Sequence, residues 1–301
     1  MRSTLSALSI LLLALPALPL TGQTPRTAAP ALELPAGARA VGLGGAAQLG
    51  VDDPDHLFSH PAWLGRAGFR VAGWIMDEDA SIFTLATGTS ALGGRVAVGI
   101  RAAEWTGVAP GTEPGGLDRF IGEGEVGRNT TAGTVGYARD LLGVQVGVTA
   151  TLLSERADEV RERDVAFDLG LGHEVAGVNL SAVARNLGRD LDFASEVALP
   201  TTYEVGAGTY GIVLGPVDLG AAARVGVRED DHVVAGGGLE IGYFPIQGRT
   251  FIGRVGVQSV PDGDASHVTL GGSFRGDELV IDYAWREVDG TSLHVITLGW
   301  R

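Results

Sequence analysis

From Phe69 to the C-terminus, apolar residues alternate along the chain with small or polar residues. In the stretch 217–228, one face carries valine, leucine and alanine, while the other carries aspartate, glycine, alanine and arginine. The same division recurs at 144–152, 165–172 and 279–286. Side chains that alternate with a period of two are those of β-strands. The pattern therefore predicts an all-β chain.

Fourteen such strands are predicted along the chain. They span 69–76, 81–89, 94–103, 130–139, 143–154, 164–174, 178–186, 202–213, 217–228, 232–243, 250–259, 267–275, 279–286 and 292–301. Strands of about ten residues with one apolar face are typical of transmembrane barrels. A soluble β-sandwich also alternates, with its apolar face in a core, so alternation alone does not separate the two architectures.

The connections between these strands alternate in character. Odd-numbered connections are polar or long: 77–79, 104–129, 155–163, 187–201, 229–231, 261–266 and 287–291. Even-numbered connections are mostly tight: 91–93, 140–142, 175–177, 214–216, 244–249 and 276–278. Bacterial outer-membrane barrels combine an even strand count with long extracellular loops and short periplasmic turns. We therefore predict a 14-stranded antiparallel transmembrane outer-membrane β-barrel over 69–301.

The N-terminus predicts export. Met1 and Arg2 precede an apolar stretch from Leu5 to Leu20, which Pro16 and Pro19 interrupt. A membrane-spanning helix needs about 20 apolar residues, so a secretory signal peptide over 1–22 is the better interpretation and an uncleaved anchor the alternative. No cysteine follows to accept a lipid. We expect the mature chain in the bacterial outer membrane, with 23–68 as a periplasmic or plug segment.

Composition excludes several classes of protein. The chain has no cysteine, which rules out a disulfide framework, a cysteine zinc site and a thiol nucleophile. Its net charge of −14 argues against a nucleic-acid partner. Most of the 47 glycines fall on the non-apolar strand face, where they reduce crowding inside a barrel and let strands bend.

Catalytic motifs are missing from the sequence. None of the six histidines lies in a G-x-S-x-G or H-E-x-x-H pattern. A pairing of His267 with Ser273 or Asp282 is a weaker alternative to polar residues at strand ends. The acidic pairs 52–53 and 230–231 lack the spacing of a calcium loop. We expect no enzyme activity, no metal and no cofactor.

Charged residues on the inner strand face are the remaining candidate site. The expected lumen contacts are Arg95, Arg101, Asp168, Arg185, Asp218, Arg224, Glu240, Arg254 and Asp282, with Glu174, Glu204 and Arg228 as further members. Because charges inside a membrane usually pair, they can brace the barrel and its plug. They can alternatively form a polar route or contact the headgroup of an amphiphile. The long connection 104–129 is either a lid or partner surface, or a disordered decoration.

Three regions of the sequence carry a family resemblance. The glycine-rich stretch 38–46, the acidic-proline segment 52–54 and His-Pro-Ala-Trp-Leu at 60–64 resemble the N-terminal signature of PorV/PorQ-type outer-membrane proteins, relatives of the FadL-type hydrocarbon transporters. Arg-Asn-Leu-Gly at 185–188 with Leu-Pro-Thr-Thr-Tyr at 199–203 resembles the seventh and eighth strands of that family. The region from 282 to the C-terminus resembles its closing hairpin.

The resemblance implies a 14-stranded barrel whose N-terminal segment folds into or against the lumen. The implied plug motif consists of Gly44, Gly45, Asp52, Asp53, Pro54, His60, Pro61 and Ala62. His60 and Trp63 stand where the family has asparagine and glycine. If that asparagine caps a turn of the plug, an imidazole is expected to do so less well, which bears on any gating role.

The resemblance also sets out the functions to compare. It implies passive, non-enzymatic transport of small hydrophobic or amphipathic molecules. The alternative is a PorV-like component of type IX secretion that binds secreted or membrane proteins, and a purely structural barrel is a third. An inner face of glycine, alanine, threonine and charge argues against an apolar channel. Expected partners are outer-membrane lipid, the barrel-assembly machinery, and either a hydrophobic small molecule or secretion-system proteins.

Overall fold

The computed structural model describes most of the chain. The described residues are 27–46, 53–65, 67–75, 80–106, 127–157, 160–193, 196–259, 267–288 and 291–300. The predicted signal peptide, Asp52 and most of the connection 104–129 lie outside them. Among the described residues, no helix is long and apolar enough to cross a membrane.

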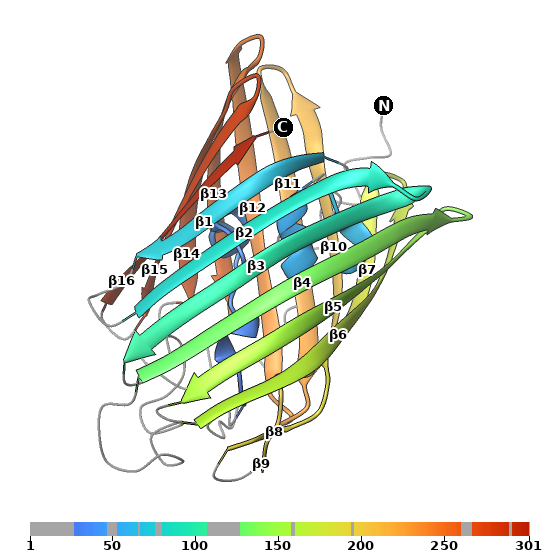
Figure 1. Cartoon of the computed structure of the whole chain (residues 1–301). Coiled ribbons are helices and arrows are strands. Elements are labelled where there is room, and N and C mark those ends of the chain that lie inside the picture. Colours follow the sequence, from blue (N-terminus) through green and yellow to red (C-terminus); the bar gives the residue numbers. More distant parts are fainter. Residues whose placement is uncertain are drawn as a thin grey trace.

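Fourteen strands form one closed antiparallel barrel within the described residues (Figure 1). They are β1 (Ala67–Ile75), β2 (Ala80–Ala91), β3 (Gly94–Thr106), β4 (Gly127–Leu141), β5 (Val144–Ala157), β6 (Val160–Val175), β7 (Val178–Leu187), β10 (Thr202–Leu214), β11 (Val217–Arg228), β12 (Val233–Ile246), β13 (Arg249–Gln258), β14 (Val268–Arg275), β15 (Leu279–Val288) and β16 (Thr291–Trp300). The barrel closes where β1 pairs with β16, with Phe69 opposite Trp300. This confirms the predicted fold class.

Most of the larger differences from the predicted strand ends lie at one end of the barrel, and at the other end β12 runs on to Ile246, inside the predicted connection 244–249. The ladder of β5 and β6 continues to Ala157 and Val160 and includes the pair Arg156 and Arg161, which we had assigned to a connection. Charged residues do not mark the end of a strand there, because two strands that extend beyond the apolar layer can keep their backbone pairing in water. The connection 187–201 contains a small hairpin of β8 (Leu191–Asp192) and β9 (Glu196–Val197), which the sequence analysis missed.

The two ends of the barrel have different connections. At one end, here called the turn end, strands are joined by two- or three-residue turns, and the other end is called the loop end. Three turns place two successive residues at positive φ: Leu92-Gly93, Leu142-Gly143 and Ala176-Gly177. Positive φ at both central positions defines a type I′ turn, whose twist matches that of the flanking strands.

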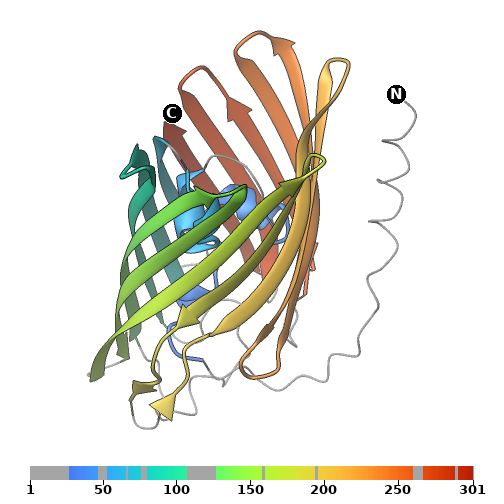
Figure 2. The same cartoon turned by 90° about the vertical axis from the view of Figure 1, so that its right-hand side faces the viewer.

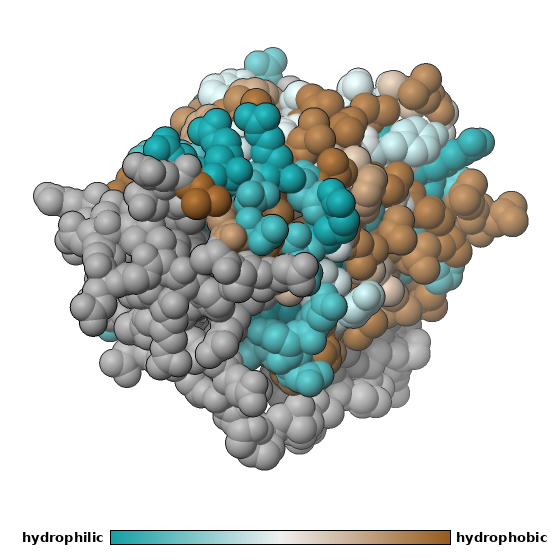
Figure 3. Space-filling view, turned by 60° about the horizontal axis from the view of Figure 1, so that its bottom comes forward, coloured by the Kyte–Doolittle hydropathy of each residue, from teal (hydrophilic) through white to brown (hydrophobic). Residues whose placement is uncertain are grey.

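The outer face of the barrel is apolar. Leu152 is 69% exposed, Leu169 53% and Ile241 53%, whereas their inward neighbours Leu153 and Asp168 are buried. Figure 3 shows hydrophobic side chains along the flank of the barrel and hydrophilic ones gathered towards the loop end. An apolar outer face around a polar interior is the arrangement of a transmembrane barrel.

The described residues before β1 run through the interior of the barrel (Figure 2). We call residues 27–46 and 53–65 the lumen segment. It contains η1 (Pro30–Leu32), α2 (Ala38–Gly42), η2 (Pro54–Phe58) and η3 (Pro61–Trp63). Its first residues lie at the loop end, where the Ala28 amide donates to the carbonyl of Ala198. The segment therefore crosses the lumen before the chain enters β1 at the turn end.

Glycines on the inner face mark where the lumen segment presses on the wall. A Cβ added at Gly236 would lie 1.9 Å from the carbonyl oxygen of Gly44, and one at Gly147 would lie 2.2 Å from the carbonyl carbon of Pro61. Gly133 and Gly253 lie on the outer face and have nothing within 4 Å of an added Cβ. The inner glycines thus permit close backbone contact, beyond the relief of crowding that we had predicted.

The contact at Gly236 gives a first testable prediction. Gly236→Ala should lower the free energy of unfolding by about 1–3 kcal/mol, because the new methyl group cannot be placed without moving Gly44. Limited proteolysis should then cut the lumen segment faster. Gly253→Ala, on the neighbouring strand but facing open space, is the matched control and should change the stability by less than about 0.5 kcal/mol. Equal behaviour of the two variants would contradict the packing described.

Candidate functional site in the barrel lumen

Arginines of the wall bind backbone carbonyls of the lumen segment. Arg101 on β3 donates to the carbonyl oxygen of Ala31. Arg185 on β7 donates to the carbonyls of Leu32 at 2.8 Å and Phe58 at 3.3 Å. The Arg101 guanidinium also lies 5.0 Å from the centroid of the Phe58 ring, within cation–π range. Two arginines on strands that β4, β5 and β6 separate thereby hold both halves of the segment.

Other polar side chains of the wall complete this set of backbone contacts. The Ala29 amide donates to Glu155, and the Ala38 amide donates to Oγ1 of Thr297 at 2.9 Å. Thr84 Oγ1 donates to the carbonyl of Ala36 at 2.8 Å. Buried backbone groups require such partners, and the short helices and turns of the segment satisfy only part of them. The wall therefore determines the path of the segment.

A chain of four charges links the segment to three strands. Arg39 of α2 pairs with Glu240 at 3.2 Å, and Glu240 pairs with Arg254 at 3.1 Å. Arg254 in turn pairs with Asp282 at 2.8 Å. If Arg39 left, Glu240 would still have Arg254 as its partner. Glu240 therefore keeps a cationic partner in the wall whether or not the segment is docked.

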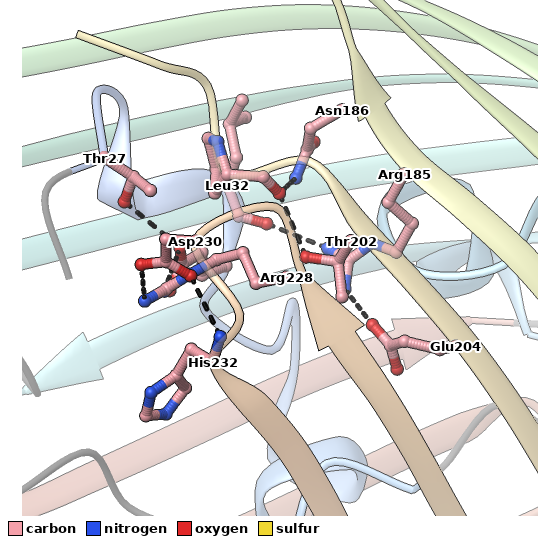
Figure 4. Close-up of polar contacts among 11 residues, drawn as sticks. Thr27, Leu32, Arg185, Asn186, Thr202, Glu204, Arg228, Asp230 and His232 are labelled. Atoms are coloured by element: carbon pink, nitrogen blue, oxygen red, sulfur yellow. Dashed lines mark hydrogen bonds and ion pairs between the residues drawn. The ribbon is translucent and has the colours of Figure 1, made fainter. Parts of the chain in front are cut away.

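A second charged group lies closer to the loop end (Figure 4). Arg228 pairs with Glu33 of the segment at 2.6 Å and with Asp230, next to its own strand, at 2.8 Å. Glu204 pairs with Arg185 at 3.3 Å and with Arg224 at 2.7 Å. Here too, a wall arginine that binds a segment carboxylate keeps another carboxylate partner within the barrel.

The predicted lumen residues fall into several groups rather than one site. Arg95, Arg101, Arg185 and Glu240 contact the lumen segment directly, Arg95 through the carbonyl of Ala62 at 2.9 Å. Asp168 accepts bonds from Oγ1 of Thr149 and the amide of Asn186, both at 2.7 Å. The remaining members have partners or neighbours in the wall. Asp218 lies against Gly242, Arg224 pairs with Glu204, and Arg254 pairs with Asp282. Glu174 is exposed near the turn end. This geometry is that of a braced interior, and contact with a passing molecule stays a prediction.

The described part of the plug motif lies inside the barrel. Gly44 and Gly45 have positive φ and pass close to Gly236 and to the guanidinium of Arg224. Pro54 begins η2, while Pro61 and Ala62 lie against Gly147. Asp53 accepts the amide of Asp55 at 3.2 Å and pairs with Arg70 at 3.2 Å. Burial raises the pKa of Asp53, but Arg70, His56 and the amide of Asp55 together outweigh burial, so the pKa lies below its usual range.

His60 stands at the start of η3 without making a capping bond through its side chain. Its ring is fully buried, and neither ring nitrogen has a hydrogen-bond partner. Burial, and then the nearby His56, lowers the pKa of the imidazole from 6.5 to about 3. The ring is therefore neutral, in line with the expectation that an imidazole caps this turn poorly.

Several residues that contact or belong to the segment escaped the sequence analysis. Arg70 lies on the inner face of β1, and the alternation of that strand could have predicted its inward direction. Glu155 was assigned to a connection although it is buried inside β5. Glu33 and Arg39 lie in the lumen segment, which has no regular period, and no sequence signal points to them. Within the described ranges, no group of three or more histidine, cysteine or acidic side chains is arranged to hold a metal ion.

A small cavity lies between the lumen segment and β10. Arg39, Leu43, Tyr210 and Glu240 are among the residues that line it, and it has room for about one water molecule. β10 has a bulge beside it, between Thr209 and Ile212, and pairs with β7 only over Thr202–Gly208. The wall is therefore least regular next to the cavity.

Comparison with known proteins identifies the fold. No family model and no curated protein matches the sequence. Among solved structures, the CymD monoaromatic hydrocarbon channel is similar at a TM-score of 0.63 and 12% identity, over 88% of this chain and 96% of that one. The toluene transporter TodX of Pseudomonas putida gives 0.59 and 10%, over 88% and 97%. A FadL homologue of Pseudomonas aeruginosa gives 0.51 and 11%, over 87% and 97%. The likeness shows a FadL-type barrel fold and does not confirm the PorV/PorQ relation.

The charge chain gives a prediction with a matched pair of variants. Arg254→Met should lower the free energy of unfolding by about 3 kcal/mol or more, because it removes a buried cation from between two carboxylates. Arg39→Met removes the other cation beside Glu240 but leaves Arg254 in place, so we expect a loss nearer 1 kcal/mol. Urea unfolding of both variants measures the difference. A larger loss for Arg39→Met would contradict the charge chain.

The buried imidazole predicts that acid loosens the lumen segment. The pKa of His60 is lower in the folded protein than in the unfolded chain, so its contribution to stability is present above pH 6.5. That contribution falls by about 1.4 kcal/mol per unit as the pH drops from 6.5 towards 3. Protease cleavage of the segment should accelerate between pH 7 and pH 5.

His60→Leu is the control for this prediction, because it keeps an apolar side chain at the site and removes the titrating ring. Its cleavage rate should depend much less on pH. Asp55 acts in the opposite direction, since burial and Asp53 raise its pKa and its contribution is lost as the pH rises. The same pH profile for wild type and His60→Leu would show that His60 is not responsible.

Proposed function

We propose that the protein is a passive, non-enzymatic outer-membrane channel for small hydrophobic or amphipathic molecules. The observation that carries the proposal is a closed 14-stranded barrel with its own N-terminal segment threaded through the lumen. Solved channels and transporters for monoaromatic hydrocarbons share this fold over 88% of the chain. An N-terminal signal peptide and the barrel-assembly machinery would deliver the chain to the outer membrane.

The interior has apolar surface that suits such a cargo. Leu57, Phe58 and Leu64 of the lumen segment pack together with small wall residues such as Ala97 and Ala138. Our prediction of a polar inner face considered the strands alone, and the segment adds large apolar side chains to it. A small hydrophobic molecule that enters between segment and wall would keep these surfaces covered.

Passage requires the lumen segment to move. The cavity beside β10 has room for about one water molecule, and a benzene ring is much larger. The wall carboxylate Glu240 and the wall arginine Arg228 each keep a barrel partner when the segment leaves. Movement of residues 27–46 therefore leaves these two wall charges paired, while Arg101 and Arg185 lose their bonds to the carbonyls of Ala31 and Leu32.

The PorV-like secretion component remains the alternative from the sequence, and the comparisons do not favour it. A secretion component would bind proteins and would not need a mobile lumen segment. The two functions therefore differ in whether small molecules cross and in whether the segment must be free.

Uptake by cells tests the proposal. Gram-negative cells that express the protein should take up radiolabelled toluene several-fold faster than cells with the empty vector. Ala38→Cys with Thr297→Cys should lock the segment to β16, because the Ala38 amide and Thr297 Oγ1 are 2.9 Å apart. The natural chain has no cysteine, so this disulfide would be the only one. Uptake should fall on oxidation and return on reduction.

A second disulfide controls for the effect of oxidation. Thr134→Cys with Thr151→Cys joins β4 and β5 through inward side chains whose hydroxyl oxygens are 2.9 Å apart. It leaves the segment free and should not change uptake. Uptake no faster than with the empty vector would overturn the transport proposal, whereas uptake that the segment lock does not reduce would overturn only the requirement for movement.

A further inference from the structure

Two turns at the turn end carry leucine where the backbone disfavours it. Leu92 and Leu142 have φ of 55° and 58° as first residues of type I′ turns. Asparagine, aspartate and glycine are the usual residues at that position, because other side chains crowd the backbone in the left-handed region. A leucine there costs conformational energy, so its side chain must contribute something that offsets this cost.

Contacts within the chain do not supply that contribution. The side chain of Leu142 is 104% exposed and that of Leu92 is 83% exposed. The neighbours Leu141 and Val175 are exposed as well, at 50% and 48%. Large apolar side chains gathered at the ends of adjacent hairpins favour a partner outside the chain. The Tyr137 hydroxyl donates to the carbonyl of Leu92 at 3.1 Å and so connects the two hairpins.

The apolar outer face of the barrel continues directly into these turns. On β5 the outward residues are apolar from Val144 to Leu152, and polar residues, Ser154 and Arg156, follow only towards the loop end. On β4 the outward Arg139 is exposed near the turn, and its long side chain can reach lipid phosphates. The lipid-facing surface of β4 and β5 therefore begins at the turn itself.

Aromatic residues mark the membrane boundary on the other side of the barrel. Phe69 and Trp300 form an outward pair with ring centroids 6.2 Å apart, and Phe251 and Phe274 form another at 5.4 Å. All four lie near the turn end of their strands, as the aromatic girdles of transmembrane barrels do. Such aromatic residues are scarce on the β2–β7 side. In the described parts of these strands, Tyr137 is the one outward-facing aromatic residue near the turn end.

We propose that Leu92 and Leu142 insert into the membrane boundary and replace the aromatic girdle on the β2–β7 side. Their partner is the acyl-chain region of the phospholipid leaflet at the turn end. The continuity with the lipid-facing strands selects lipid over a protein partner. This anchor holds the β2–β7 side at a defined depth, and it does so whatever molecule the lumen carries.

The depth of each turn can be measured with a single introduced cysteine. Leu142→Cys and Leu92→Cys are labelled with a nitrobenzoxadiazole fluorophore, whose emission shifts to the blue in an apolar environment. Glu278→Cys is the matched control, because it lies in the polar turn 276–278 between β14 and β15 and is exposed. The labelled proteins are reconstituted at low density in phosphatidylethanolamine and phosphatidylglycerol vesicles.

We expect blue-shifted emission at positions 92 and 142 that lipids with a doxyl group on the acyl chain quench. Position 278 should show the emission of a fluorophore in water and little quenching. Emission at 92 and 142 that matches position 278 would overturn the proposal, and would leave a protein partner as the explanation for these side chains.

A second measurement separates lipid insertion from turn strain. Asparagine suits the left-handed region, so Ala176→Asn relieves backbone strain in a third turn of the same type without removing a large side chain. Its urea midpoint in lipid bilayers should stay the same or rise. Leu92→Asn with Leu142→Asn should lower the midpoint, because two membrane anchors are lost. A rise for the leucine variant as well would overturn the proposal.

Discussion

The structure depends on one constraint: the backbone of the lumen segment satisfies only part of its hydrogen bonds by itself. Its helices are one turn or so in length, and the described residues between them form turns and bends. Side chains of the wall therefore supply the partners, with Arg101 and Arg185 on carbonyls and Glu155 and Thr297 on amides. Because these residues lie on separate strands, the path of the segment depends on several strands of the closed barrel.

Two further properties of the barrel follow from this. The backbone of the segment has to approach the wall closely, which requires glycines on the inner face at positions such as Gly147 and Gly236. The wall also carries buried charged side chains, and some of them pair within the barrel, as Glu240 does with Arg254 and Arg228 with Asp230. Loss of the segment would leave Glu240 and Arg228 paired, but Arg101 would lose its bond to the carbonyl of Ala31.

Alternation was sufficient to predict the strands because each has one face in lipid and one in the lumen. The inward arginines at 101, 185 and 254 followed from the same parity. Parity gives only the direction of a side chain, so it did not show that Arg101 binds a carbonyl while Arg254 binds a carboxylate. Glu33 and Arg39 were missed because the segment takes its conformation from the wall and has no period of its own.

Hydrogen exchange in lipid nanodiscs, followed by mass spectrometry, tests the central claim most directly. The amides of residues 27–46 should exchange slowly in the protein alone, because the barrel shields and holds them. Added toluene should speed their exchange and leave that of the barrel strands unchanged. Rapid exchange of this segment without toluene would contradict the account, since it would mean that the wall contacts do not hold the segment in the lumen.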